Sequence, residues 1–157
     1  MALAKNLFST PKKYQIFLYG QNHLQKSNLM NNLYLFLAGL MAGMILFQAA
    51  LNAPTIFKVY SEEQAGPFLR AIFPKLFLNV AVLSLIGVVL SVIGDRLSLQ
   101  ILFFVSFLLM GISYLIVPAT NKARDEGRDK SFKYLHLLSV ILTLLTLILC
   151  LIILVVT

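Results

Sequence analysis

One histidine stands out among the few residues of this chain that could take part in chemistry. His136 opens a row of polar or small side chains at spacings of three and four residues, which continues through Ser139, Thr143, Thr146 and Cys150. This spacing puts the row on one side of a helix. One interpretation is helix packing, since small residues let a neighbouring helix approach and hydroxyls bond across the interface or to their own backbone. The other is that His136, an ionisable group near a membrane boundary, belongs to a binding site.

Further polar side chains are expected to gather with His136 at one end of the molecule. The candidate pocket consists of Gln48, Asn52, Asn79, Asn121, His136 and Ser139. They lie near the membrane face that bears the two long connecting segments, and Arg124 or Arg128 could reach over them. A shallow polar pocket with His136 as its titratable member is the functional interpretation. The alternative is that these groups cap helix ends and bond one another.

Most catalytic machinery is absent from the sequence. No carboxylate lies inside a predicted span, and there is no HExxH motif, no CxxC motif and no glycine-rich phosphate loop after a strand. Cys150 is the single cysteine, so neither an intrachain disulfide nor a cysteine-based metal site is expected. A membrane haem held by two histidines would need two subunits, or another ligand such as a methionine. We therefore expect neither catalysis nor a resident cofactor, and the sequence does not identify a metal.

The composition indicates a membrane protein. Of the 157 residues, 59% are hydrophobic and only 12% are charged, whereas soluble domains carry about 25% charged residues. The formal net charge of +7 comes from basic residues in the N-terminal tail and the connecting segments, where lysine and arginine face anionic lipid. The expected partners are the lipid bilayer and either a second copy of the chain or another membrane protein. Nucleic acid is not expected.

Four apolar stretches predict an all-α protein, a polytopic integral membrane four-helix bundle. The spans are expected at about residues 33–51, 76–93, 97–117 and 135–156. The last runs for 22 residues from Leu135 to Val156, about 33 Å of helix at about 1.5 Å per residue, which is enough to cross a hydrocarbon core about 30 Å thick. Residues 94–96 predict a tight turn between the second and third spans.

Prolines are expected to delimit these spans. Pro54 should end the first span and Pro118 the third, because proline disfavours helix at the residue before it. Between the first two spans, Ser61 is expected to cap a short interfacial helix that Pro67 and Pro74 interrupt.

Small residues at helical spacing predict where the spans pack together. The first span contains a GxxxG pair, and the second contains serines and a glycine at spacings of three and four. The predicted packing residues are Gly39, Gly43, Ser84, Gly87, Ser91, Thr143 and Thr146. Such residues allow helices in a membrane to approach closely.

The N-terminal region is expected to differ from the remainder of the chain. Residues 1–28 are basic and predict a mobile tail at a lipid surface, followed by a transmembrane domain at 29–157. The alternatives are an organellar transit peptide, or a natural start at Met30 with an upstream extension before it. Lysine and arginine are more numerous in the two long loops, which favours both loops in the cytoplasm and both termini outside.

A series of motifs runs through the four spans in order. In chain order the motifs are Gly43, Phe47, Ala53-Pro54-x-x-Phe57, Gln64-Ala65-Gly66, Phe73-Pro74, Asn121 and Phe132-x-x-x-His136-x-x-Ser139. The series covers about residues 29–156 and resembles the transmembrane protein 205-like family, whose bacterial members form a domain of unknown function. The resemblance implies a four-helix integral membrane fold and no defined activity. The family's animal relative is associated with platinum-drug resistance, which points toward the handling of small molecules or metals.

These observations favour a non-catalytic multi-pass membrane protein. We expect it to be a membrane scaffold or to bind a small lipophilic or metal-bearing ligand near His136. The alternative is a haem- or quinone-linked membrane redox protein that uses His136 in a homodimer. The expected location is the bacterial cytoplasmic membrane, with an organellar membrane as the alternative.

Overall fold

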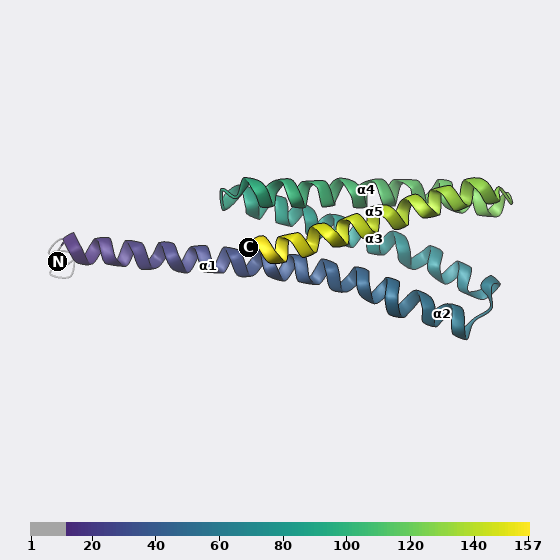
Figure 1. The fold of residues 1–157 in the computed structure, drawn as a ribbon, viewed down its shortest axis with the longest axis horizontal. Helices are drawn as coiled ribbons and strands as arrows, with labels where there is room; N and C mark the ends of the chain where they lie inside the picture. The colour runs from purple at the N-terminus through teal and green to yellow at the C-terminus, as the bar shows by residue number, and fades with distance from the viewer. Residues whose placement is uncertain (1–11) are drawn as a thin grey trace, which may run out of the picture. The chain divides into compact units, whose positions relative to one another are not determined.

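The computed structural model describes residues 12–157, and all of its regular structure is helical. The elements are α1 (Lys12–Leu46), the π-helix η2 (Phe47–Asn52), α2 (Ala53–Val59), α3 (Glu62–Ile93), α4 (Leu97–Asp125) and α5 (Asp129–Val156) (Figure 1). Within the described residues, four helical stretches are long and apolar enough to cross a membrane: Tyr14–Val59, Glu63–Ile93, Leu97–Asp125 and Asp129–Val156. The predicted all-α fold with four candidate membrane helices is confirmed.

The chain divides into two compact units, Met1–Leu33 and Tyr34–Thr157. The described part of the first unit, residues 12–33, is the N-terminal portion of α1. The predicted basic tail at 1–28 is therefore helical from Lys12 onward, and its first eleven residues lie outside the described part of the chain. Its mobility at a lipid surface stays a prediction. The second unit contains the rest of α1 and every other helix.

The two loops expected to be long are mostly helical, which leaves short connections at residues 60–61 and 126–128; both lie at one end of the second unit and the tight turn at the other. Figure 1 shows the α2–α3 connection beside the α4–α5 turn, opposite the turn between α3 and α4. The predicted tight turn at residues 94–96 is confirmed, with Asp95 at a φ of 51°. Gly127, at a φ of 65°, reverses the chain between α4 and α5 in a backbone conformation that glycine adopts without strain.

Three prolines do not break the helices, so these sequence predictions are wrong. Pro67 and Pro74 lie inside α3, and Pro118 lies inside α4. The separate interfacial helix is consequently the first part of α3, although Ser61 is its cap as predicted, with its hydroxyl accepting from the Gln64 N–H at 3.4 Å. Membrane helices tolerate proline where local adjustments and neighbouring groups satisfy the freed carbonyls. In these long apolar segments the helix therefore continues despite the local preference of proline for a helix end.

Pro54 does not end the first helical stretch either, because a π-helix precedes it. In η2 the hydrogen bonds reach five residues back, and the Ala53 N–H bonds to the Gln48 carbonyl. Pro54 then falls in the first turn of α2, directly after the π-helix has shifted the hydrogen-bond register. The first stretch therefore stays helical to Val59, beyond its predicted end at residue 51.

Side chains from α1 and α4 meet α3 in the interior of the second unit. The buried face of α1 includes Tyr34, whose hydroxyl donates to the Leu90 carbonyl of α3 at 2.9 Å. The Tyr34 ring also lies 6.3 Å from the Phe103 ring of α4, centroid to centroid. The Ser84 hydroxyl of α3 lies 3.8 Å from the Met41 sulfur of α1. The contact between α1 and α3 is therefore made by large side chains.

Among the predicted packing residues, Gly87 makes the closest approach. A Cβ atom built on Gly87 would overlap the ring of Phe103, which is fully buried. Ser84 and Ser91 are also buried and bond backbone carbonyls of their own helix. Thr146 is buried on α5, which packs against α4. These positions permit close helix contact without leaving a hydroxyl unbonded.

The predicted packing at Gly39 and Gly43 is not found among residues 12–157, the part that the structure describes. Both glycines are exposed, and a Cβ atom at either would have no neighbour within 4 Å. Packing falls instead on the adjacent face of α1, which carries Ala38, Met41 and Ile45. The physical reason is that α3 approaches α1 through the bulky Tyr34 face, so no glycine is required between them.

We expect Gly87→Ala to destabilise the protein by about 1–3 kcal/mol, because the added methyl group overlaps the Phe103 ring in a packed interface. Gly43→Ala is the matched control and should be neutral or stabilise by up to about 1 kcal/mol, since alanine favours helix and the site is open. Thermal unfolding in mild detergent measures both. Equal melting temperatures for the two variants would show that α3 and α4 do not meet at Gly87.

Tyr34→Phe should cost about 1 kcal/mol, because it removes a hydrogen bond from a fully buried hydroxyl while keeping the ring. Tyr114→Phe on the exposed face of α4 is the control and should change the stability little. Unfolding of both variants by a denaturing detergent tests this. A cost at Tyr114 as large as that at Tyr34 would argue against the α1–α3 contact.

Candidate functional site

A cavity of about 650 Å³ lies in the second unit at the end that bears the α2–α3 and α4–α5 connections. Every helical element of this unit contributes to its wall. Ile45, Ala49, Ala53 and Phe57 form a stripe at four-residue spacing that passes from α1 through η2 into α2. The wall is thus continuous across the π-helix, and it is apolar.

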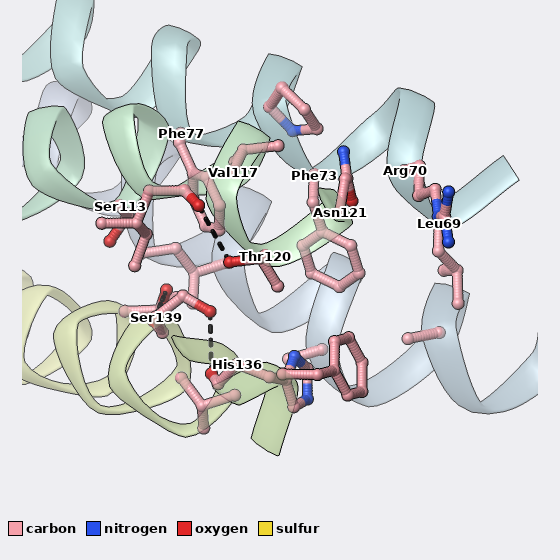
Figure 2. A pocket seen from close by; sticks show the side chains of 18 of the residues that line it. Leu69, Arg70, Phe73, Phe77, Ser113, Val117, Thr120, Asn121, His136 and Ser139 are labelled. Carbon is pink, nitrogen blue, oxygen red and sulfur yellow. Dashed lines mark hydrogen bonds between the residues drawn. The ribbon is translucent and has the colours of Figure 1, made fainter. Parts of the chain in front are cut away.

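The opposite walls come from the other three helices. Figure 2 shows Phe73 and Phe77 of α3 together with Ser113 of α4 and His136 and Ser139 of α5 around the same space. Beyond Ser139, the α5 wall continues through Val140, Thr143, Leu144 and Leu147. The cavity is therefore mainly hydrophobic, with hydroxyl and imidazole groups on one side.

His136 is stacked rather than isolated. Its ring lies parallel to the ring of Phe132, with centroids 5.8 Å apart and an interplanar angle of 10°. The guanidinium carbon of Arg124 lies 4.9 Å from the centroid of the same Phe132 ring. Cation–π attraction and stacking thus orient a cationic group from α4 and an ionisable group from α5 about one aromatic ring. All three residues line the cavity.

A second arginine reaches the cavity from α3. Arg70 donates from Nη1 to Oδ1 of Asp125 at 2.7 Å, which joins the early part of α3 to the end of α4. Both side chains are partly exposed, so the pair contributes at most about 1 kcal/mol to stability. The main consequence of the ion pair is to fix the position of the Arg70 guanidinium at the charged end of the cavity.

The hydroxyl groups of the wall donate to their own helices. Ser113 and Thr120 bond the carbonyls four residues earlier in α4, each at 2.9 Å. Ser139 bonds the His136 carbonyl at 2.8 Å and Thr143 bonds the Ser139 carbonyl at 2.7 Å. Since each hydroxyl uses its one proton in this way, what it offers to the cavity is an acceptor oxygen.

Half of the predicted pocket residues line the cavity. Asn121, His136 and Ser139 do so, and Arg124 reaches it as expected. Arg128 does not line it and instead pairs with Glu126 at 2.7 Å. The predicted shallow polar pocket is therefore a larger and mostly apolar cavity with a polar end.

Gln48, Asn52 and Asn79 do not line the cavity, which corrects the sequence prediction. Gln48 and Asn52 bond each other at 2.7 Å. They precede the wall residues Ala49 and Ala53 by one position each, and one position is about 100° around a helix. Asn79 is exposed, two positions beyond the wall residue Phe77 and thus on the far side of α3.

Gln48 is also unusual in the interior of the second unit. It is 4% exposed, and its Nε2 has no hydrogen-bond partner in the described structure. A buried amide donor without a partner is energetically unfavourable, and here it lies within the π-helix. The π-helix beside the cavity wall is therefore locally destabilised by this amide.

Sequence reasoning missed Arg70 and the aromatic part of the wall. Phe73 and Phe77 lie four residues apart, but an apolar stripe at this spacing describes a packed core equally well. No sequence signal places Arg70 at the cavity, because Pro67 and Pro74 predict an interrupted helix around it. The continuous α3 is what carries its side chain to the cavity.

The described side chains contain no cluster of three or more His, Cys, Asp or Glu residues arranged to hold a metal ion. The groups with ligand or donor chemistry at the cavity are His136, Asn121, Arg70 and Arg124. They suit an organic ligand through hydrogen bonds and charge.

Comparisons with known proteins identify a family and no activity. No curated protein and no solved structure matches the chain. The family model described as "Domain of unknown function (DUF4149)" matches residues 36–129, which run from the middle of α1 to the start of α5. The match includes the cavity walls from η2, α2, α3 and α4 but ends before His136. Because it spans more than half of the sequence, this chain belongs to the DUF4149 family.

Proposed function

We propose that this membrane protein binds a small lipophilic molecule in the cavity, with the polar part of the molecule near His136. The observation that carries the proposal is the cavity itself, about 650 Å³ of mostly apolar space with polar groups at one end. Ligand sites in proteins have volumes of about 300–1,000 Å³ and combine apolar walls with a few placed polar groups. The cavity has both properties.

The arrangement of the helices also supports binding over simple packing. α3 packs against α4 and α4 against α5, while wall residues of α1, η2 and α2 face the cavity from its other side. Apolar wall residues remain accessible, with Phe57 56% exposed and Leu144 52% exposed. In a bilayer such a surface is filled by lipid tails or by a ligand, since apolar side chains at this depth gain dispersion contacts from either.

The proposal includes a membrane context and a narrower relationship. We propose that the protein lies in the bacterial cytoplasmic membrane and binds without catalysing a reaction. Within DUF4149, its motifs relate it to the transmembrane protein 205-like family. The motif Phe132-x-x-x-His136-x-x-Ser139 supports this relationship, because it is similar to the family's motif at the start of its last helix.

The test compares the ligands that co-purify with three variants of the full chain. Leu144→Trp adds a ring to the cavity wall, whereas Leu145→Trp adds the same ring one position away, at a similarly exposed residue outside the wall. His136→Ala removes the imidazole. Lipophilic compounds are extracted from protein purified in mild detergent and quantified by mass spectrometry, with an absorption spectrum and metal analysis of each sample.

We expect a lipophilic compound to co-purify with the unmodified chain and with Leu145→Trp, and to fall at least about tenfold in Leu144→Trp, because the added ring occupies its volume. His136→Ala should lower its amount less. If all four proteins carry the same compounds in the same amounts, the cavity is not a binding site and a scaffold role is favoured. A Soret band or a stoichiometric metal that disappears in His136→Ala would favour the redox alternative instead.

A further inference from the structure

The charges around the cavity are of one sign. Its lining residues include Arg70 and Arg124 together with the ionisable His136, and they include no aspartate or glutamate. Asp125 lies next to the wall and pairs with Arg70, so it offsets one of the two positive charges. The charge of Arg124 lies over the Phe132 ring. The charged end of the cavity is therefore cationic overall.

The cavity is also polarised along the helix axes. On α4 its lining runs from Arg124 back to Ser113, and on α5 from Phe132 forward to Leu147. These stretches cover eleven and fifteen residue steps, about 16 Å and about 22 Å of helix. Polar and cationic groups lie at one end of both stretches, while α5 ends in Thr143, Leu144 and Leu147. A ligand that matches this wall has a charged end and a long apolar end.

The two arginines that line the cavity are positioned by contacts to different elements. Arg70 comes from α3 and is held by the ion pair with Asp125, which uses its Nη1. Arg124 comes from the last turns of α4 and is held against Phe132 of α5. A guanidinium has five N–H donors in a plane, which suits the paired oxygens of a phosphate or a carboxylate.

We propose that the ligand of this cavity is an anionic single-chain amphiphile, with a phosphate or carboxylate head at Arg124, Arg70 and His136 and its chain along Phe73, Phe77 and Leu144. This inference rests on the proposed function and adds the chemical class of the ligand. The head lies at the end of the unit where the charged connections are, so it stays at the polar boundary of the bilayer while the chain occupies the apolar cavity.

The alternative is that the basic residues near the α4–α5 turn attract anionic lipid without binding its head group in the cavity, and this alternative predicts a different result. Lys122 lies on α4 two positions before Arg124, is 70% exposed, and does not line the cavity. Loss of either positive charge would weaken general attraction to a similar degree. Only Arg124 should matter for a head group held in the cavity. Lys122→Gln is therefore the matched control for Arg124→Gln.

The experiment uses two photoactivatable probes that share one alkyl chain bearing a diazirine. One ends in a phosphate and the other in a hydroxyl group. The full-length protein in lipid nanodiscs is labelled with each probe, and labelled residues are mapped by peptide mass spectrometry. We expect labels on the cavity walls, with the phosphate probe labelling about tenfold more than the alcohol at equal concentration, since hydrogen bonds to a charged group strengthen its binding.

Arg124→Gln should lower the ratio of phosphate to alcohol labelling about tenfold, and Lys122→Gln should leave the ratio unchanged. Arg70→Gln should lower the ratio as well, although it also removes the ion pair with Asp125. Leu144→Trp should lower both probes alike, because it occupies the space of the chain. Excess inorganic phosphate should not compete with the phosphate probe, whereas an unlabelled alkyl phosphate should.

Several results would overturn the assignment. Equal labelling by the two probes, still lost in Leu144→Trp, would contradict an anionic head while leaving lipophile binding in place. An equal fall of the ratio in Arg124→Gln and Lys122→Gln would show general attraction by the loop. Full competition by inorganic phosphate would show a free anion as the ligand. Absence of cavity labelling by either probe, unchanged in Leu144→Trp, would contradict the proposed function itself.

Discussion

The close approach of α3 and α4 at Gly87 is the contact on which the second unit depends. Phe103 occupies the space that a side chain at Gly87 would need, and both positions are buried. Serines on both helices bond their own backbone, so the interface contains few groups that require a partner from the other helix. Close packing of this kind holds helices together in a membrane, where the hydrophobic effect does not distinguish a neighbouring helix from lipid.

The cavity results from how the remaining helices attach to that pair. α1 packs on α3 through large side chains such as Tyr34, and α5 packs on α4 through Thr146, Cys150 and Ile153. Because α1 and α5 pack on different helices and not on each other, an open space remains between them at the end that bears the α2–α3 and α4–α5 connections. The π-helix η2 lies in this wall and carries the chain past Pro54 without a break in the helix. An open apolar space with charged groups at its end is the result.

Much of the fold could be predicted from hydrophobicity alone, and the failures share one cause. The four apolar stretches, the turn at residues 94–96 and the cap at Ser61 are all local signals, and the structure has each of them. Pro67, Pro74 and Pro118 are local signals too, yet the helices continue through them, since long apolar segments tolerate proline where neighbouring groups satisfy the freed carbonyls. The prediction that Gly43 packs against another helix failed for a related reason. A glycine pair permits close helix contact but does not show which face a partner helix occupies.

Only half of the predicted pocket residues line the cavity. Polar residues in the sequence indicate the polar end of the cavity, but they do not indicate its apolar wall. His136, Ser139 and Asn121, which line the cavity, are predictable because polar residues in an apolar helix are rare. The stripe from Ile45 to Phe57 has the spacing of any buried helix face, and it becomes a cavity wall because α5 lies across the cavity without packing against it. Whether a stripe meets another helix depends on residues far away in the sequence, such as Gly87 and Tyr34. A single apolar pattern therefore cannot distinguish a core from the wall of a cavity, and the arginines that α3 and α4 contribute to this wall become apparent only once the helices are placed in space.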